Sequence, residues 1–127
     1  MAKFRIVGIS FDHMHMGDLL RMVDAHPDAE IAGIFDPNPA RMESAIATFG
    51  IPESRVFTDF DACMAAGPYD MAILCSATAD HATYTERLAP HRMHIFVEKP
   101  FAASTEDARR MMATMEGTGK LMAINWP

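Results

Sequence analysis

Short apolar runs alternate with longer segments of helical period along the chain, and this alternation constrains the fold more than any other feature of the sequence. Strands are expected at Phe4–Ile9, Ile31–Phe35, Val56–Phe57, Met71–Cys75, His94–Val97 and Leu121–Ile124. Helices are expected at Gly17–Ala25, Pro39–Phe49, Asp61–Ala66, Asp80–Leu88 and Thr105–Glu116. This order predicts an α/β fold with an open, doubly wound sheet, because right-handed crossovers join parallel strands through helices.

Length and composition describe an ordinary one-domain protein. The chain has 127 residues, of which 50% are hydrophobic, and a formal net charge of −6. It has no basic surface suited to a nucleic-acid backbone, no apolar run near the roughly 18 residues of a membrane span, and no secretory signal at its start. Cys63 and Cys75 are expected to be buried apolar groups. We therefore expect a cytoplasmic protein that binds neither nucleic acid nor a membrane.

The topology also predicts where a ligand binds. In a doubly wound sheet, ligands lie outside the carboxyl ends of the strands, at the point where the strand order reverses. The loops after Ile9, Phe35, Cys75 and Val97 are therefore the candidate binding loops.

The loop after the first strand resembles a phosphate-binding loop only in part. A dinucleotide fingerprint has three glycines, so that the backbone approaches a pyrophosphate at the start of a helix. Only Gly8 fits, whereas Ser10 and His13 occupy the other two positions, and Gly17 comes later. A small serine and a protonatable histidine are compatible with phosphate binding, but a histidine-bearing surface loop explains the segment equally well.

A metal site is a further interpretation of the same loop. Asp12, His13 and His15 are common ligand types. Three such residues within four positions rarely converge on one ion, and the sequence shows no fourth ligand, so we expect no metal.

The acidic residue after the second strand points to the choice of cofactor. Asp36 can accept hydrogen bonds from a ribose 2′-hydroxyl and would repel a 2′-phosphate, which favours NAD over NADP. Arg41 is near enough in sequence to meet a 2′-phosphate, so NADP stays open. A turn aspartate before Pro37 is the structural alternative.

Small and hydroxyl side chains follow the fourth strand. Ser76 and Thr78 leave room for a flat cofactor, and His81 would lie in the first turn of the next helix. The more economical interpretation is that Ser76, Thr78 and Asp80 cap that helix.

The most specific segment follows the fifth strand. Glu98, Lys99 and Pro100 stand where the sheet opens to ligands. A lysine there can hold negative charge on a reacting oxygen, the carboxylate can hold the lysine or a ribose, and the proline can fix a turn through a cis bond. A surface Glu-Lys pair before a turn remains the alternative.

These motifs together resemble the glucose-fructose oxidoreductase, inositol dehydrogenase and rhizopine-catabolism (Gfo/Idh/MocA) family over essentially the whole chain. The resemblance rests on Phe4-Arg5-Ile6-Val7-Gly8, Ile34-Phe35-Asp36-Pro37 with Arg41, the His81 helix, and Ile95-Phe96-Val97-Glu98-Lys99-Pro100-Phe101. The Glu-Lys-Pro element is its most specific part.

The resemblance implies a Rossmann-type, mostly parallel six-stranded sheet with helices on both faces over residues 1–127, and an NAD-dependent oxidoreductase acting on a sugar, polyol or related substrate. It implies cofactor contacts at Gly8, Ser10, Asp12 and His13 for the pyrophosphate, Asp36 and Arg41 for the adenosine ribose, Ser76, Thr78 and His81 along the cofactor, and Glu98, Lys99, Pro100 and Asn125 at the nicotinamide end. Lys99 is the implied catalytic residue.

The family's second domain, which holds the substrate and supplies a histidine or aspartate, would begin after Asn125-Trp126-Pro127, where this sequence ends. We therefore expect cofactor binding without turnover, and a homo-oligomer is compatible with the resemblance. The altered phosphate loop keeps a non-catalytic ligand-binding module open, and a metal-linked lyase or isomerase at His13 and His15 is a weaker alternative.

Overall fold

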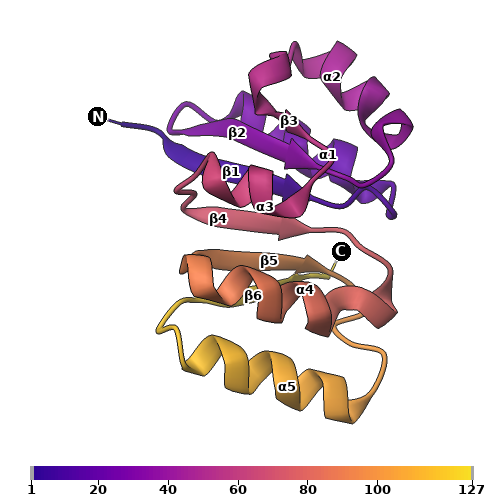
Figure 1. The fold of residues 1–127 in the computed structure, drawn as a ribbon, viewed down its shortest axis with the longest axis vertical. Coiled ribbons are helices and arrows are strands. Elements are labelled where there is room, and N and C mark those ends of the chain that lie inside the picture. The colour runs from indigo at the N-terminus through magenta and orange to yellow at the C-terminus, as the bar shows by residue number, and fades with distance from the viewer. Residues whose placement is uncertain (1, 127) are drawn as a thin grey trace.

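The computed structural model describes residues 2–126, which form one six-stranded sheet with helices on both faces (Figure 1). The strands are β1 (Phe4–Ile9), β2 (Ala29–Phe35), β3 (Val56–Phe57), β4 (Met71–Leu74), β5 (His94–Glu98) and β6 (Met122–Asn125). Their order is β3-β2-β1-β4-β5-β6, and every pair is parallel. The expected doubly wound sheet is thus confirmed, and it is wholly rather than mostly parallel. The order reverses between β1 and β4, which places the ligand edge there.

The helices divide between the two faces of the sheet. They are α1 (His15–Ala25), α2 (Glu43–Phe49), α3 (Phe60–Ala65), α4 (His81–Leu88) and α5 (Thr105–Glu116). Short 3-10 turns precede or follow them at η1 (Pro39–Met42), η2 (Glu53–Arg55), η3 (Thr78–Asp80) and η4 (Ala89–His91). Helices α3, α4 and α5 cover one face, and α1 and α2 cover the other (Figure 1).

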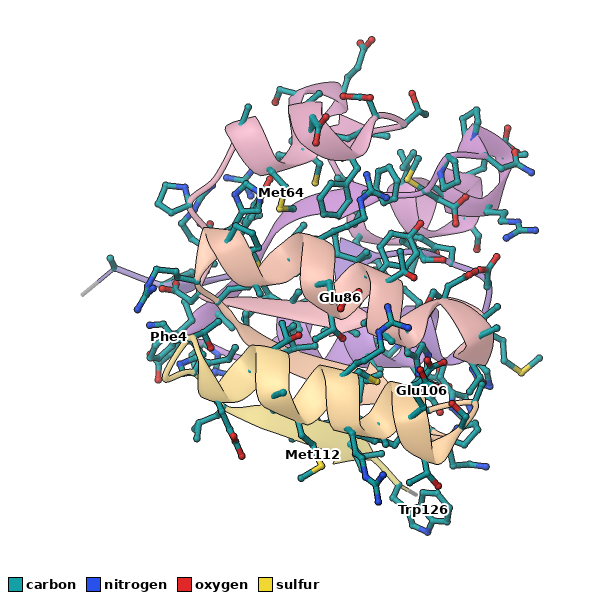
Figure 2. The ribbon with its side chains drawn as sticks, turned by 60° about the horizontal axis from the view of Figure 1, so that its bottom comes forward. Phe4, Met64, Glu86, Glu106, Met112 and Trp126 are labelled. Atoms are coloured by element: carbon teal, nitrogen blue, oxygen red, sulfur yellow. The ribbon has the colours of Figure 1, made fainter. Side chains whose placement is uncertain are left out.

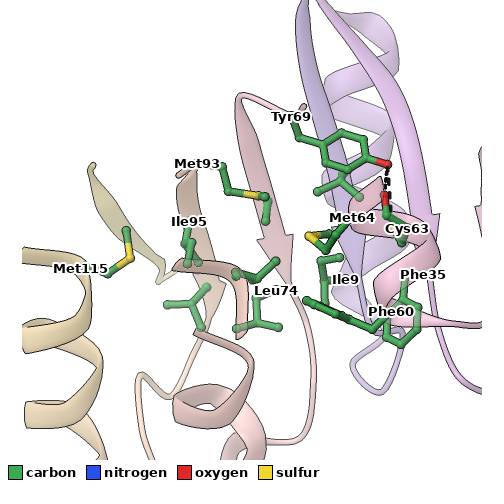
Figure 3. Packing of buried hydrophobic residues seen from close by; sticks show 14 of the residues in the cluster. Ile9, Phe35, Phe60, Cys63, Met64, Tyr69, Leu74, Met93, Ile95 and Met115 are labelled. Atoms are coloured by element: carbon green, nitrogen blue, oxygen red, sulfur yellow. Dashed lines mark hydrogen bonds between the residues drawn. The ribbon is translucent and has the colours of Figure 1, made fainter. Parts of the chain in front are cut away.

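Alternate residues of the central strands supply the two apolar layers. Val7 and Ile9 of β1 pack toward α3, α4 and α5, whereas Ile6 packs toward α1. Figure 3 shows the first layer, where Leu74 and Ile95 lie among side chains from the helices that cover it. Both faces of the central strands are therefore buried, as is typical of a parallel sheet.

Several element ends differ from those expected from the sequence. The first helix begins at His15 rather than Gly17, and the expected helix at Pro39–Phe49 is a 3-10 turn followed by α2. Asn38 caps that turn by accepting a hydrogen bond from the Ala40 N–H. The β5 strand extends to Glu98 and β6 to Asn125, so both of these side chains stand at strand ends.

Both cysteines are buried free thiols, as expected from the apolar sequence segments in which they lie. The Tyr69 hydroxyl packs against Cys63 and donates a hydrogen bond of 2.7 Å to the backbone carbonyl oxygen of that residue (Figure 3). Burial raises the pKa of the Cys63 thiol to about 11 despite its contact with Tyr69, and burial next to the charge of Glu98 raises that of Cys75 to about 12.

We expect the protein to lose stability in alkali because of these thiols. An unfolded thiol ionises near pH 9, whereas the buried thiols stay neutral, so their contribution is complete below pH 9 and falls as the pH rises toward 11 and 12. The free energy of unfolding in urea should fall by about 3 kcal/mol between pH 8 and pH 10. Cys63→Ala should flatten this slope, and an equally steep slope in that variant would contradict the assignment.

No helix within residues 2–126 combines the length and the apolar character needed to cross a lipid bilayer.

Candidate functional site

The loop from β1 to α1 turns sharply at Ser10, directly after the strand. Ser10 has a φ of 68°, the left-handed conformation that glycine adopts more easily than other residues. Its N–H donates to the Phe35 carbonyl oxygen at 2.8 Å, which extends the pairing of β1 with β2 by one residue. Ser10 thus keeps the backbone path of a glycine and adds a hydroxyl.

This geometry gives a paired test of the first loop. Ser10→Gly and Ser10→Ala both remove the bond of 3.2 Å from the hydroxyl to Asp12, but only glycine removes the steric cost of a positive φ. We expect the glycine variant to be more stable than the alanine variant by about 1 kcal/mol. Urea unfolding of the two proteins measures the difference, and equal stability would show that Ser10 is unstrained.

Asp36 is fully buried at the end of β2 and holds two loops together. It is 0% exposed. One carboxylate oxygen accepts a hydrogen bond of 2.7 Å from the Phe11 N–H, and the other accepts one of 2.8 Å from the Asn38 N–H. Both oxygens are therefore occupied by backbone groups, in the position where the sequence places a ribose contact.

The Asp12 carboxylate is the meeting point of three donors from three loops. It accepts hydrogen bonds from the Ser10 hydroxyl at 3.2 Å and the Ala77 N–H at 3.0 Å, and it pairs with the Arg41 guanidinium. A hydroxyl, a backbone amide and a guanidinium are the donors that bind phosphate oxygens in proteins. The carboxylate of Asp12 thus occupies an anion-binding position between the ends of β1, β2 and β4.

A cleft of about 200 Å³ lies beside this position, between the β1–α1 loop and α2. Its lining includes Phe11, His13 and Arg41. A second cleft of about 150 Å³ lies on the other side of α1, next to His15 and Asn125. Both are smaller than most pockets that enclose an organic ligand, so a ligand at this edge lies across the surface.

His81 joins the loop after β4 to the loop after β5. It is 1% exposed, with Nε2 lying 3.1 Å from the Ser76 carbonyl oxygen and Nδ1 lying 3.0 Å from the Phe101 carbonyl oxygen. Ser76 is also buried, whereas Thr78 begins the 3-10 turn η3 and is partly exposed. His81 therefore sets the spacing of the two loops from within the protein.

Glu98 is buried between two polar side chains at the carboxyl end of β5. It is 1% exposed, with Oε1 lying 2.9 Å from His15 Nδ1 and Oε2 accepting a hydrogen bond of 2.8 Å from the Asn125 amide. Burial alone would raise the pKa of Glu98, but the contacts with Asn125 and His15 outweigh it and lower the pKa below its usual value. Glu98 is therefore an ionised carboxylate buried at the carboxyl end of β5.

Lys99 and Pro100 follow at the outer edge of the site. The bond between them is cis, as the sequence analysis proposed for this turn. The Lys99 ammonium lies 5.5 Å from the centroid of the Trp126 ring, within reach of a cation-π contact. Trp126 is 72% exposed and lies at the outer surface (Figure 2).

The structure brings the residues singled out in the sequence to one edge of the sheet in two groups. Ser10, Asp12 and Arg41 meet in one group, and Glu98 meets Asn125 in the other. Gly8 lies within β1, beneath Met16 of α1.

Sequence reasoning missed the contact of His15 with Glu98 and that of the Ala77 amide with Asp12. The paired histidines of the first loop were the available signal for the first, and nothing in the sequence marked the second.

Comparison with known sequences relates the chain to proteins named dehydrogenases. Residues 2–126 match the family model described as "Oxidoreductase family, NAD-binding Rossmann fold". The chain is 34% identical over 88 residues to D-apiose dehydrogenase of Rhizobium rhizogenes, covering 69% of this chain and 25% of that protein. It is 30% identical over 103 residues to inositol 2-dehydrogenase of Rhizobium meliloti, covering 80% of this chain and 30% of that protein. The chain thus spans between a quarter and a third of these curated relatives.

Solved structures agree with the sequence comparison. An oxidoreductase from Agrobacterium radiobacter, solved in complex with NAD+, L-tartaric acid and magnesium, superposes with a TM-score of 0.87 at 25% identity, over 98% of this chain and 35% of that one. The WlbA dehydrogenase from Chromobacterium violaceum shares the fold at 21% identity, with the same TM-score of 0.87. The Glu-Lys-Pro element and the match over residues 2–126 together show that the chain belongs to the Gfo/Idh/MocA family of oxidoreductases, as their NAD-binding Rossmann domain.

Proposed function

We propose that this domain binds NAD(H) along the carboxyl edge of its sheet, as the cofactor half of a dehydrogenase that acts on a hydroxyl-bearing sugar or polyol. The observation that carries the proposal is the convergence of the Ser10 hydroxyl, the Ala77 amide and the Arg41 guanidinium on one carboxylate. This donor set suits a phosphate oxygen, and Asp12 occupies its position as an anion supplied by the protein itself. The membership of the family and the names of the relatives support the class of substrate.

Each of the two groups of residues would contact one half of the cofactor. Ser10, Asp12 and His13 would lie along the pyrophosphate, with Gly8 beneath it in β1. Asp36 would act through the loop that it holds, since it is fully buried and binds the Phe11 and Asn38 amides. Arg41 would lie beside the adenosine ribose, at the cleft between the first loop and α2.

The residues after β4 and β5 would form the reactive end. Ser76, Thr78 and His81 would shape the wall of the site, with His81 acting as a positioning residue. Glu98 and Asn125 would hold the nicotinamide ribose, and Pro100 would fix the turn after Lys99. When bound, the nicotinamide supplies a carbon that gains or loses a hydride.

Lys99 would be the catalytic residue of this chain. Its ammonium can donate a hydrogen bond to the substrate oxygen, which stabilises negative charge there as the hydroxyl loses its proton. The substrate and the partner acid or base would come from a further part of the enzyme, because the relatives are nearly three times as long as this chain.

The second candidate function is a ligand-binding module that no longer binds a dinucleotide. The favouring observation is that the protein's own carboxylates already occupy the Phe11 and Ala77 amides, beside a cleft of only about 200 Å³. Such a module would show no affinity for any of the four nicotinamide dinucleotides.

Calorimetric titration with NAD+, NADH, NADP+ and NADPH separates the two candidates. We expect the domain to bind the non-phosphorylated pair, and Arg41→Ala to change that binding. Arg109→Ala removes an exposed charge of α5 and serves as the matched control that leaves affinity unchanged. Absence of heat and of thermal stabilisation with all four dinucleotides at millimolar concentration would overturn the proposal.

A further inference from the structure

Two histidines of the β1–α1 loop have no part in a glycine-rich phosphate loop. His13 occupies the position where a dinucleotide fingerprint has its third glycine, and His15 begins α1. In that fingerprint the third glycine lets the helix pack closely on the strand, a requirement that does not explain an imidazole there. The pair therefore calls for an explanation beyond any contact with the dinucleotide.

The structure supplies the third group that the sequence did not reveal. Glu98 reaches the histidines from the end of β5, and one atom from each of His13, His15 and Glu98 lies within 4.8 Å of the others. The two imidazole rings are 4.4 Å apart between centroids. Asp12, the nearest other carboxylate in sequence, is engaged with Arg41 and the Ala77 amide.

The distances are close to those of a small metal site. With bonds of about 2.0 to 2.1 Å, the ligand atoms of a tetrahedral zinc ion lie about 3.3 Å apart. His15 Nδ1 and Glu98 Oε1 are already 2.9 Å apart. The two histidines are partly exposed, so rotation of the His13 side chain can close the remaining gap. Its Nδ1 now accepts a hydrogen bond of 3.2 Å from the His15 N–H, which is long and is the contact that such a rotation gives up.

The surroundings of Glu98 resemble those of a metal ligand. The Asn125 amide donates to Oε2, which fixes the orientation of the carboxylate and leaves Oε1 facing His15. Partners of this kind orient the ligands of metal sites and tune their affinity. The His15 side chain is 31% exposed, so a fourth position remains open to water or to a substrate oxygen.

We propose that His13, His15 and Glu98 form a binding site for a divalent transition metal of the zinc class. Two imidazoles and one carboxylate suit zinc, cobalt or iron, whereas magnesium and calcium prefer ligand sets made only of oxygen. The site holds one ion, with three protein ligands and one exchangeable position open to solvent. Because Glu98 is also the proposed contact of the nicotinamide ribose, the metal and that end of the cofactor exclude one another.

Metal titration tests the site without any dinucleotide, so its failure and that of NAD binding are separate results. The metal-free protein is titrated calorimetrically with Zn²⁺ and with Mg²⁺, and Co²⁺ is added to record the visible absorption of the bound ion. We expect one Zn²⁺ per chain, no heat with Mg²⁺, and the intense visible bands of four-coordinate cobalt.

Variants locate the ion. His13→Ala and His15→Ala should each weaken zinc binding at least tenfold and abolish the cobalt spectrum. His91→Ala, which removes an exposed histidine at the far end of α4, should leave both unchanged. Glu98→Gln should act like the histidine variants, with circular dichroism to confirm its fold. Zinc affinity that is the same in His13→Ala and His15→Ala as in the unmodified protein, or that falls in His91→Ala instead, would overturn the proposal.

Discussion

Asp36→Ala should lower the free energy of unfolding by about 3 kcal/mol, since it removes a buried carboxylate that accepts hydrogen bonds from two backbone amides. Each bond to a charged group contributes about 1.5 to 3 kcal/mol, and the Phe11 and Asn38 amides are left without their partner. The change acts on the loop after β1 as well as on the loop after β2. We therefore expect any affinity for NAD+ to fall together with stability, although Asp36 is fully buried.

Asp59→Ala is the matched control for this experiment. Asp59 also accepts a hydrogen bond of 2.8 Å from a backbone amide, that of Ala62, but at an exposed helix start. Its removal should cost about 1 kcal/mol, as for other helix caps. Urea unfolding of the two variants gives the comparison. A loss in Asp36→Ala no larger than that in Asp59→Ala would mean that the buried carboxylate does not organise the loops.

Asp12→Asn should raise the affinity for NADP+ about tenfold more than it raises the affinity for NAD+. The carboxylate of Asp12 pairs with Arg41, the cation next to the proposed adenosine ribose. Removal of its charge frees the guanidinium to bind a 2′-phosphate, and about 1.4 kcal/mol of added attraction is a tenfold gain. Asparagine keeps an oxygen that can accept from the Ala77 amide, so the loop should retain its shape.

The double variant Asp12→Asn with Arg41→Ala checks the cause. It should bind NADP+ no better than the unmodified domain, because the gain depends on the guanidinium. Calorimetric titration with both cofactors gives the ratio of affinities. An equal gain for NAD+ and NADP+, or a gain that survives the loss of Arg41, would show that Asp12 acts on the pyrophosphate rather than on the choice of cofactor.

The fold was predictable because its signals are local. Apolar runs and helical periodicity placed all six strands and five helices, and Asn38 and Ser104 cap the segments that they precede. The errors lie at the ends of elements. The first helix begins two residues before Gly17, since the His15 N–H bonds the His13 ring and the Met16 N–H bonds the His13 carbonyl oxygen.

The candidate site was predictable in position but not in its contacts. Sheet topology placed its residues at one edge, since parallel strands end together. The pairing of Asp12 with the Ala77 amide joins residues 65 positions apart, and that of His15 with Glu98 joins residues 83 apart. No periodicity encodes such contacts, which follow from the fold of the whole sheet. For the same reason, the two hydrogen bonds of Asp36 to backbone amides and the burial of His81 can be seen only in the structure.

The most direct test of cofactor binding at this edge is a nuclear magnetic resonance titration of the ¹⁵N-labelled domain with NAD+. We expect the largest amide shifts at Phe11 and Ala77, whose N–H groups now bind carboxylates, with further shifts at the Lys99 turn. Shifts confined to the opposite edge of the sheet, where Lys3 and Arg55 line a separate cleft, would contradict the account, as would an unchanged spectrum at millimolar NAD+.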